Sequence, residues 1–187
     1  MDIALLFGSF NPIHNGHMHI ANHILKSKIC NEVWFVVSPQ NPLKKNIHLL
    51  DEQLRLKLIT KVVKNIDNMQ VCDIEFSLPR PSYTYKTLLK LKNKHPKDSF
   101  YLIIGGDNLD IFNKWRDYNK ILDEFKLIVY PRTGSKELSI SHPNIFKLDA
   151  ILKNISSTEI RENIKKDKSI TNIVPDSIIN DVLKYYS

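Results

Sequence analysis

The chain has 187 residues, 42% of them hydrophobic, and a formal net charge of +7. Its length fits one α/β domain better than two very small ones, and its apolar fraction is sufficient for an ordinary core. The positive charge indicates anionic partners, which could be nucleic acid, an acidic membrane or phosphorylated small molecules.

No apolar run approaches the roughly 18 residues that span a bilayer, and no basic segment opens the chain, so we expect a cytoplasmic protein without membrane contact. The two cysteines, Cys30 and Cys72, form no C-x-x-C pair, which argues against a zinc knuckle or a redox dithiol.

Apolar runs alternate with segments of helical periodicity along the whole chain. We expect strands at residues 3–7, 32–37, 71–76, 100–104, 126–130 and 145–148. We expect helices at residues 15–28, 51–65, 84–94, 108–112, 117–124, 157–166 and 175–185. This alternation predicts a single Rossmann-like α/β domain over residues 1–187, with a doubly wound, mostly parallel sheet, helices on both faces and a C-terminal helical portion from about residue 155. Ligands of such sheets bind at the carboxyl ends of the strands, so the loops that follow the strands should carry the chemistry.

The loop between the first strand and the first helix, residues 8–17, is suited to holding phosphate. A helix start offers N–H groups and a partial positive charge that favour an anion. At about 100° per residue, His14 and His17 fall on the apolar side of this helix and face inward, whereas His19 and His23 project toward solvent. The four histidines cannot converge on one ion, which weakens a zinc interpretation. The simpler alternative is that His14 and His17 only cap and pack the loop.

A second motif lies near the carboxyl terminus. Ser156, with Glu159 three residues later, forms a capping box that opens a helix. The same geometry leaves hydroxyl and N–H groups facing outward, and Arg161 can add a charged fork for a phosphate. The motif therefore allows a structural role and an anion-binding role together.

These two motifs resemble those of a known superfamily. Residues 14–17 are similar to the HxGH signature of the nucleotidyltransferases, and residues 155–161 are similar to their ISSTxIR motif. Further segments resemble the nicotinate-mononucleotide adenylyltransferase branch, so that the similarity covers nearly the whole chain: Tyr83-Thr84, Gly105-Gly106-Asp107, Trp115 and Pro131-Arg132-x-Gly134. One departure is Pro42-Leu43-Lys44-Lys45, which stands where the family usually has Pro-Pro-His-Lys.

The resemblance implies site residues of three kinds. Catalytic roles are implied for His14, His17 and Arg161. ATP contacts are implied for Gly8, Ser9, Phe10, His14, Gly16, His17, Gly105, Asp107, Ile155, Ser156, Ser157, Thr158 and Arg161. Mononucleotide contacts are implied for Asn11, Lys44, Lys45, Thr84, Asp107, Trp115 and Arg132, with the Trp115 indole stacking on the pyridine ring. No residue is expected to bind a metal directly, since Mg²⁺ would be held mainly through ATP oxygens.

The activity implied by the resemblance is transfer of AMP from ATP to nicotinate mononucleotide in NAD biosynthesis, with ATP and the mononucleotide as partners and no nucleic acid. Nicotinamide-mononucleotide and pantetheine-phosphate adenylyltransferases and a cytidylyltransferase are the alternatives within the superfamily, and a homo-oligomer is left open. A P-loop and a G-x-G-x-x-G fingerprint are both missing, which disfavours P-loop kinases and ordinary dehydrogenases. A basic RNA-binding module is the alternative from another class, but no cluster of aromatic and basic residues supports it.

Overall fold

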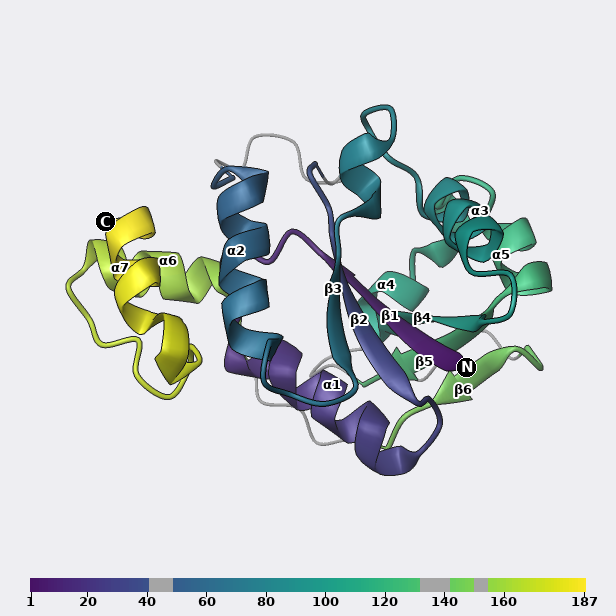
Figure 1. Cartoon of the computed structure of the whole chain (residues 1–187), viewed down its shortest axis with the longest axis horizontal. Helices are drawn as coiled ribbons and strands as arrows, with labels where there is room; N and C mark the ends of the chain where they lie inside the picture. Colours follow the sequence, from purple (N-terminus) through teal and green to yellow (C-terminus); the bar gives the residue numbers. More distant parts are fainter. Residues whose placement is uncertain (41–48, 132–141, 150–154) are drawn as a thin grey trace.

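A computed structural model describes residues 1–40, 49–131, 142–149 and 155–187 (Figure 1). Its centre is a sheet with the strand order β3-β2-β1-β4-β5-β6, and every strand pair in it is parallel. The strands are β1 (Asp2–Gly8), β2 (Glu32–Val37), β3 (Met69–Cys72), β4 (Ser99–Gly105), β5 (Lys126–Tyr130) and β6 (Ile145–Lys147). The chain starts at the middle of the sheet, builds outward to β3 and then returns to build the other half. The doubly wound parallel sheet expected from the sequence is confirmed.

Helices cover both faces of this sheet. They are α1 (Asn15–Ser27), α2 (Glu52–Val63), α3 (Thr84–Lys94), α4 (Gly106–Leu109), α5 (Tyr118–Glu124), α6 (Ser157–Lys165) and α7 (Ile179–Tyr186). Three short 3₁₀ turns complete the described elements: η1 (Ile74–Ser77), η2 (Phe112–Lys114) and η3 (Asp176–Ile178). In Figure 1, α1, α2, α6 and α7 lie on one side of the sheet, and α3 and α5 lie on the other.

Successive residues of each strand point to opposite faces of the sheet, so each strand contributes to two separate cores. Leu6 and Phe35 belong to the core beneath α1 and α2, whereas their chain neighbours Leu5 and Trp34 belong to the core beneath α3 and α5. Because both sets are apolar, the strands appear in the sequence as continuous apolar runs. Helices α6 and α7 join the first core through Ile160 and Val182, both fully buried. None of the described helices is long and apolar enough to cross a membrane.

One expected strand was assigned wrongly. The alternation over residues 71–76 predicted a strand, but β3 ends at Cys72 and the chain then turns into η1. The turn is closed by two bonds, from Phe76 N–H to the Asp73 carbonyl at 2.8 Å and from Leu78 N–H to the Glu75 carbonyl at 3.1 Å. In this turn Ile74 and Glu75 are both buried.

Two helical assignments also shift. The short helix expected at residues 108–112 begins earlier as α4, directly after β4. The helix expected from residue 175 starts as η3 and becomes α-helical at Ile179. Asp51 caps α2 as expected, because its carboxylate accepts hydrogen bonds from the N–H groups of Gln53 at 2.9 Å and Leu54 at 3.3 Å.

Candidate active site

The loop after β1 is built around Phe10. This residue has a positive φ of 45° and is only 2% exposed, with its ring edge-on to the rings of His17 and Phe35 at 5.0 and 5.7 Å. A Cβ atom on Gly8 would lie 2.9 Å from the Phe10 ring, so glycine is needed there. The side chain of Phe10 belongs to the core, which leaves its backbone as the part that could contact ATP.

His14 and His17 form a stacked pair at the start of α1. Their ring centroids are 3.7 Å apart and their planes are inclined by 27°. His14, the N-cap residue, is 6% exposed, and its main-chain N–H donates to Nδ1 of His17 at 3.3 Å. Because a main-chain N–H can only donate, the proton of a neutral His17 ring lies on Nε2. His17 is thereby prepared as a hydrogen-bond donor through Nε2.

Gly16 makes this stack possible. A Cβ atom at this position would lie 3.0 Å from Nδ1 and 3.1 Å from Cε1 of His14. The N–H of Asn15, the first residue of α1, donates to the Ile173 carbonyl at 2.9 Å. His19 and His23 face each other further along α1, with ring centroids 6.5 Å apart.

The C-terminal motif lies directly against this loop. Ser156 caps α6 by accepting from the Glu159 N–H at 3.1 Å, as the capping box predicted. The hydroxyl of Ser157 donates to the Pro12 carbonyl at 2.9 Å, and Nη1 of Arg161 donates to the Asn11 carbonyl at 2.6 Å. Nη2 of Arg161 also donates to Thr158 Oγ1 at 3.2 Å. Two motifs from opposite ends of the chain therefore form one surface.

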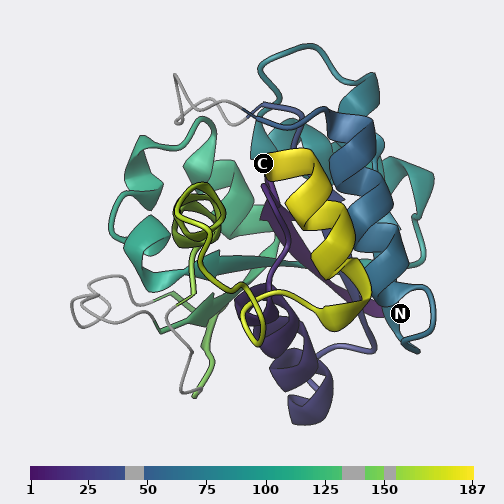
Figure 2. The same cartoon turned by 90° about the vertical axis from the view of Figure 1, so that its left-hand side faces the viewer.

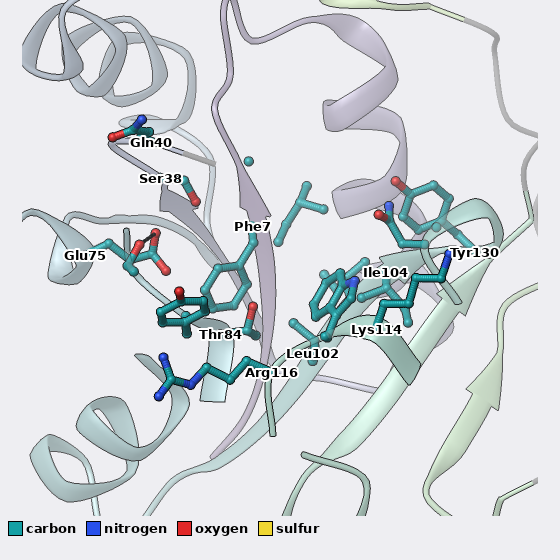
Figure 3. A pocket seen from close by; sticks show the side chains of 18 residues that line it. Phe7, Ser38, Gln40, Glu75, Thr84, Leu102, Ile104, Lys114, Arg116 and Tyr130 are labelled. Atoms are coloured by element: carbon teal, nitrogen blue, oxygen red, sulfur yellow. Dashed lines mark hydrogen bonds between the residues drawn. The ribbon is translucent and has the colours of Figure 1, made fainter. Parts of the chain in front are cut away.

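A pocket of about 300 Å³ opens beside the loop, at the carboxyl ends of β1, β2, β4 and β5 (Figure 3). Four of the expected site residues line it: Gly8, Thr84, Gly105 and Trp115. Glu75 and Thr84 lie on one side of it, and Lys114 and Tyr130 lie on the other. This is the crevice between β1 and β4, where the strand order reverses and where ligands of such sheets bind.

Several lining residues were missed in the sequence: Phe7, Ser38, Gln40, Glu75, Ser82, Asn108, Lys114, Arg116 and Tyr130. Phe7, Ser38 and Tyr130 could have been found, because each stands at or just beyond a strand end. Glu75 lay in a segment assigned to a more exposed strand, so no pattern pointed to it.

Glu75 organises one wall of the pocket. It is 3% exposed, and its two carboxylate oxygens accept hydrogen bonds from the hydroxyls of Ser82 at 2.9 Å and Thr87 at 2.8 Å. Thr87 belongs to the first turn of α3, and Thr84 is the first residue of that helix. The start of α3 is thus held against the pocket by a buried carboxylate.

The opposite wall contains Trp115 and Gly105. The indole Nε1 atom of Trp115 is buried and has no acceptor among the residues that the structure describes. A Cβ atom on Gly105 would collide with the Asp107 carboxylate and lie 3.2 Å from the Tyr130 ring. Lys44, Lys45 and Arg132 lie outside the described residues.

A buried arginine holds the loops after β1 and β2 by hydrogen bonds to their main-chain carbonyls. Arg55 of α2 is 1% exposed and donates to main-chain carbonyls of Ser9 at 2.5 Å, Ser38 at 2.8 Å, Pro39 at 3.2 Å and Leu50 at 2.8 Å. Burial lowers the pKa of its guanidinium. Arg55 joins the loops after β1 and β2, and nothing in its helical sequence context indicated this role.

Known proteins are similar to this chain over nearly its whole length. A family model described as cytidylyltransferase-like matches residues 5–163. A probable nicotinate-nucleotide adenylyltransferase of Cytophaga hutchinsonii is 46% identical over 190 aligned residues, covering 100% of this chain and 99% of the relative. One from Azobacteroides pseudotrichonymphae is 44% identical, covering 98% and 97%. The chain belongs to the nicotinate-nucleotide adenylyltransferase family.

The structural neighbours show the same fold at lower identity. The nicotinic acid mononucleotide adenylyltransferase of Plasmodium falciparum, complexed with NaAD, has a TM-score of 0.82 and is 23% identical, over 98% of this chain and 95% of that one. The same Plasmodium enzyme complexed with APC has a TM-score of 0.80. The full-length relatives confirm the family assignment predicted by the HxGH and ISSTxIR resemblances, and the solved structures confirm the fold.

Proposed function

We propose that this chain transfers AMP from ATP to nicotinate mononucleotide, forming nicotinate adenine dinucleotide and pyrophosphate. The observation that carries the proposal is the contact of the ISSTEIR segment with the histidine loop, through the Arg161 bond to Asn11 and the Ser157 bond to Pro12, beside a pocket at the carboxyl ends of the strands. The names of the full-length relatives agree with it.

In the proposed reaction an oxygen of the mononucleotide 5′-phosphate attacks the α-phosphorus of ATP. A new P–O bond forms as the bond from the α-phosphorus to the bridging oxygen breaks, and the electron pair leaves with pyrophosphate. The attacking phosphate is already ionised at neutral pH, so no general base is required. The protein has to supply in-line positioning and neutralisation of the charge that spreads over the phosphoryl oxygens.

The histidine pair suits this task. Nδ1 of His17 accepts from the His14 N–H, so a neutral His17 ring carries its proton on Nε2. The Nε2–H group can then donate a hydrogen bond to an α-phosphate oxygen. Stacking on the buried His14 ring restricts the orientation of His17 before substrate arrives. Arg161 and the hydroxyls of Ser156 and Thr158 are the proposed contacts of the β- and γ-phosphates, since the Ser157 hydroxyl already donates to the Pro12 carbonyl.

We propose that Mg²⁺ binds together with ATP. The described residues contain no group of three or more histidine, cysteine, aspartate or glutamate side chains that could enclose an ion. Mg²⁺ in nucleotide sites is often bound mainly by phosphate oxygens and water, and we propose that arrangement here. Its chemistry would be to neutralise charge on the triphosphate.

The preference for nicotinate over nicotinamide is proposed to come from the start of α3. This end of the helix, at Thr84, lines the pocket and favours a negative group, and the cationic side chains of Lys114 and Arg116 line the same pocket. The carboxylate of nicotinate would be favoured there over a neutral amide. Trp115 offers a ring face on which either pyridine ring can stack.

The proposal is tested by measuring pyrophosphate release from ATP with nicotinate mononucleotide, nicotinamide mononucleotide and phosphopantetheine in separate reactions. The expected result is the highest kcat/KM with nicotinate mononucleotide. A higher value with either of the other acceptors would replace the substrate assignment. Absence of turnover with all three, together with RNA binding that weakens steeply with salt, would favour the non-enzymatic alternative.

A further inference from the structure

The C-terminal part of the chain, residues 155–187, forms hydrogen bonds to the loop that carries His14 and His17. Among the described residues, five hydrogen bonds cross from it to residues 11–15. Their donor and acceptor pairs are Arg161 to the Asn11 carbonyl, Tyr186 to the Asn11 side chain, Ser157 to the Pro12 carbonyl, the Asn15 N–H to the Ile173 carbonyl, and the Asn15 side chain to the Asn172 carbonyl. Figure 2 shows α7, which carries Tyr186, lying alongside α2 on this face of the molecule. The loop is therefore held from outside as well as by the sheet.

Asn11 is where these contacts concentrate. It is 3% exposed, and its Oδ1 atom accepts from the Leu50 N–H at 3.1 Å and from the Tyr186 hydroxyl at 2.7 Å. Because a main-chain N–H can only donate, the bond from Leu50 assigns the oxygen of the amide to this side. Tyr186 then occupies the other acceptor direction of the same oxygen. The side chain and the main chain of Asn11 are both fixed by residues far away in the sequence.

We propose that Tyr186 is a positioning residue for AMP transfer, because its hydroxyl holds Asn11 and thereby the loop that carries His14 and His17. His14 follows Asn11 by three residues, and its N–H in turn orients His17 through Nδ1. A displacement of Asn11 is passed to the histidine pair through this short connection. The proposal concerns the reaction assigned under Proposed function and rests on it.

The phenol is chemically suited to a fixed donor role. Burial raises the pKa of Tyr186, while the nearby guanidinium groups of Arg55 and Arg161 act in the opposite direction without reversing the shift. The hydroxyl therefore keeps its proton across the physiological pH range and donates to Asn11. The same two arginines donate to the carbonyls of Ser9 and Asn11, so Tyr186 lies near both arginines that hold the main chain of the loop.

The test uses the full chain and removes one oxygen atom with Tyr186→Phe. The matched control is Tyr185→Phe on the same helix, since the Tyr185 hydroxyl makes no hydrogen bond to any residue that the structure describes and the residue is likewise half-buried. One lost hydrogen bond corresponds to roughly a three- to tenfold effect. We expect Tyr186→Phe to lower kcat by about this factor with both KM values within twofold of wild type, and Tyr185→Phe to leave kcat unchanged. Equal kcat values for the two variants would overturn the proposal.

A double-mutant cycle identifies the path of the effect. If Tyr186 acts through Asn11, Tyr186→Phe should have no further effect on kcat in an Asn11→Ala background. The same fractional loss in both backgrounds would show that Tyr186 acts elsewhere and would overturn the proposal.

Amide hydrogen exchange gives a readout without activity. The amides of Asn11 and of residues 13–15 should exchange at least threefold faster in Tyr186→Phe than in wild type or Tyr185→Phe. Unchanged exchange would contradict the positioning role even if Asn11→Ala fails to fold. A wild-type protein that does not transfer AMP, yet shows this exchange difference, would refute the proposed function and leave the structural coupling standing.

Discussion

The imidazole ring of His17 lies on that of His14, with 3.7 Å between the centroids, and the two residues are also joined by the bond from the His14 N–H to the Nδ1 atom of His17. The stack and the hydrogen bond restrain the same ring by different atoms. Together they fix the direction in which the Nε2 atom of His17 points.

His17→Ala should lower kcat by roughly 10²- to 10³-fold with a smaller change in KM, because it removes an electrostatic donor used in the transition state. The comparison is steady-state kinetics against His23→Ala, which removes a histidine of the same helix outside the stack. We expect normal kinetics for His23→Ala. A His17→Ala enzyme with normal kcat would leave this residue only a packing and capping role.

Gly16→Ala should separate stability from activity. Alanine is favoured over glycine within helices by up to about 1 kcal/mol, which should offset the cost of the new contact, so the free energy of unfolding should stay within about 1 kcal/mol of wild type. The added Cβ atom would lie 3.0 Å from His14 Nδ1, and this buried ring would have to move. We expect kcat to fall by about tenfold, as for a lost hydrogen bond at the reacting centre. Unchanged kcat at unchanged stability would show that the stack tolerates displacement.

Glu75→Ala should impair mononucleotide binding more than ATP binding. It leaves the buried hydroxyl of Ser82 without its acceptor, which costs about 1–3 kcal/mol, and leaves Thr87 only the longer bond to the Tyr83 carbonyl at 3.4 Å. Since these residues hold the start of α3 against the pocket, KM for the mononucleotide should rise while KM for ATP stays near wild type. Glu75→Gln keeps the shape and one carbonyl oxygen, so its effect should be intermediate. An equal rise in both KM values would contradict a role confined to this wall.

Arg161→Ala should weaken ATP use more than mononucleotide use, because only ATP carries the β- and γ-phosphates. The bond from Arg161 to the Asn11 carbonyl adds a structural effect, so unfolding should become easier by about 1.5–3 kcal/mol, the range for a hydrogen bond from a charged group. The control is Lys165→Ala, an exposed cation on the same helix. Chemical denaturation and substrate titrations measure both parts. Equal kinetic losses toward both substrates would indicate a purely structural arginine.

Trp115→Ala should reduce kcat/KM for nicotinate and nicotinamide mononucleotides by a similar factor, because the indole face can stack on either ring. The preference for the acid should persist, since it is assigned to the start of α3. Trp115→Phe should recover part of the loss by restoring a ring. Both substrates have to be compared at one ionic strength. A preference abolished in Trp115→Ala would transfer the selectivity from the backbone to the indole.

The strands, the helix caps and the family could be predicted from the sequence, because each depends on residues that are close together in the chain. Continuous apolar runs such as residues 3–7 were recognisable as strands buried on both faces, because each face meets its own core. The caps at Asp51 and Ser156 depend on residues two to three positions away and were predicted correctly. The HxGH and ISSTEIR segments identified the family because they keep their chemistry in contiguous residues.

Other features were decided only by tertiary structure, because their partners lie far apart in the sequence. Glu75, in the turn that follows the shortened strand, points inward to hydroxyls 7 and 12 residues away. The guanidinium of Arg55 is buried because carbonyls from three separate segments converge on it. Tyr186 reaches Asn11 across 175 residues. Periodicity and propensity describe neighbours along the chain, so they could not show which polar groups would be desolvated together and would need one another as partners.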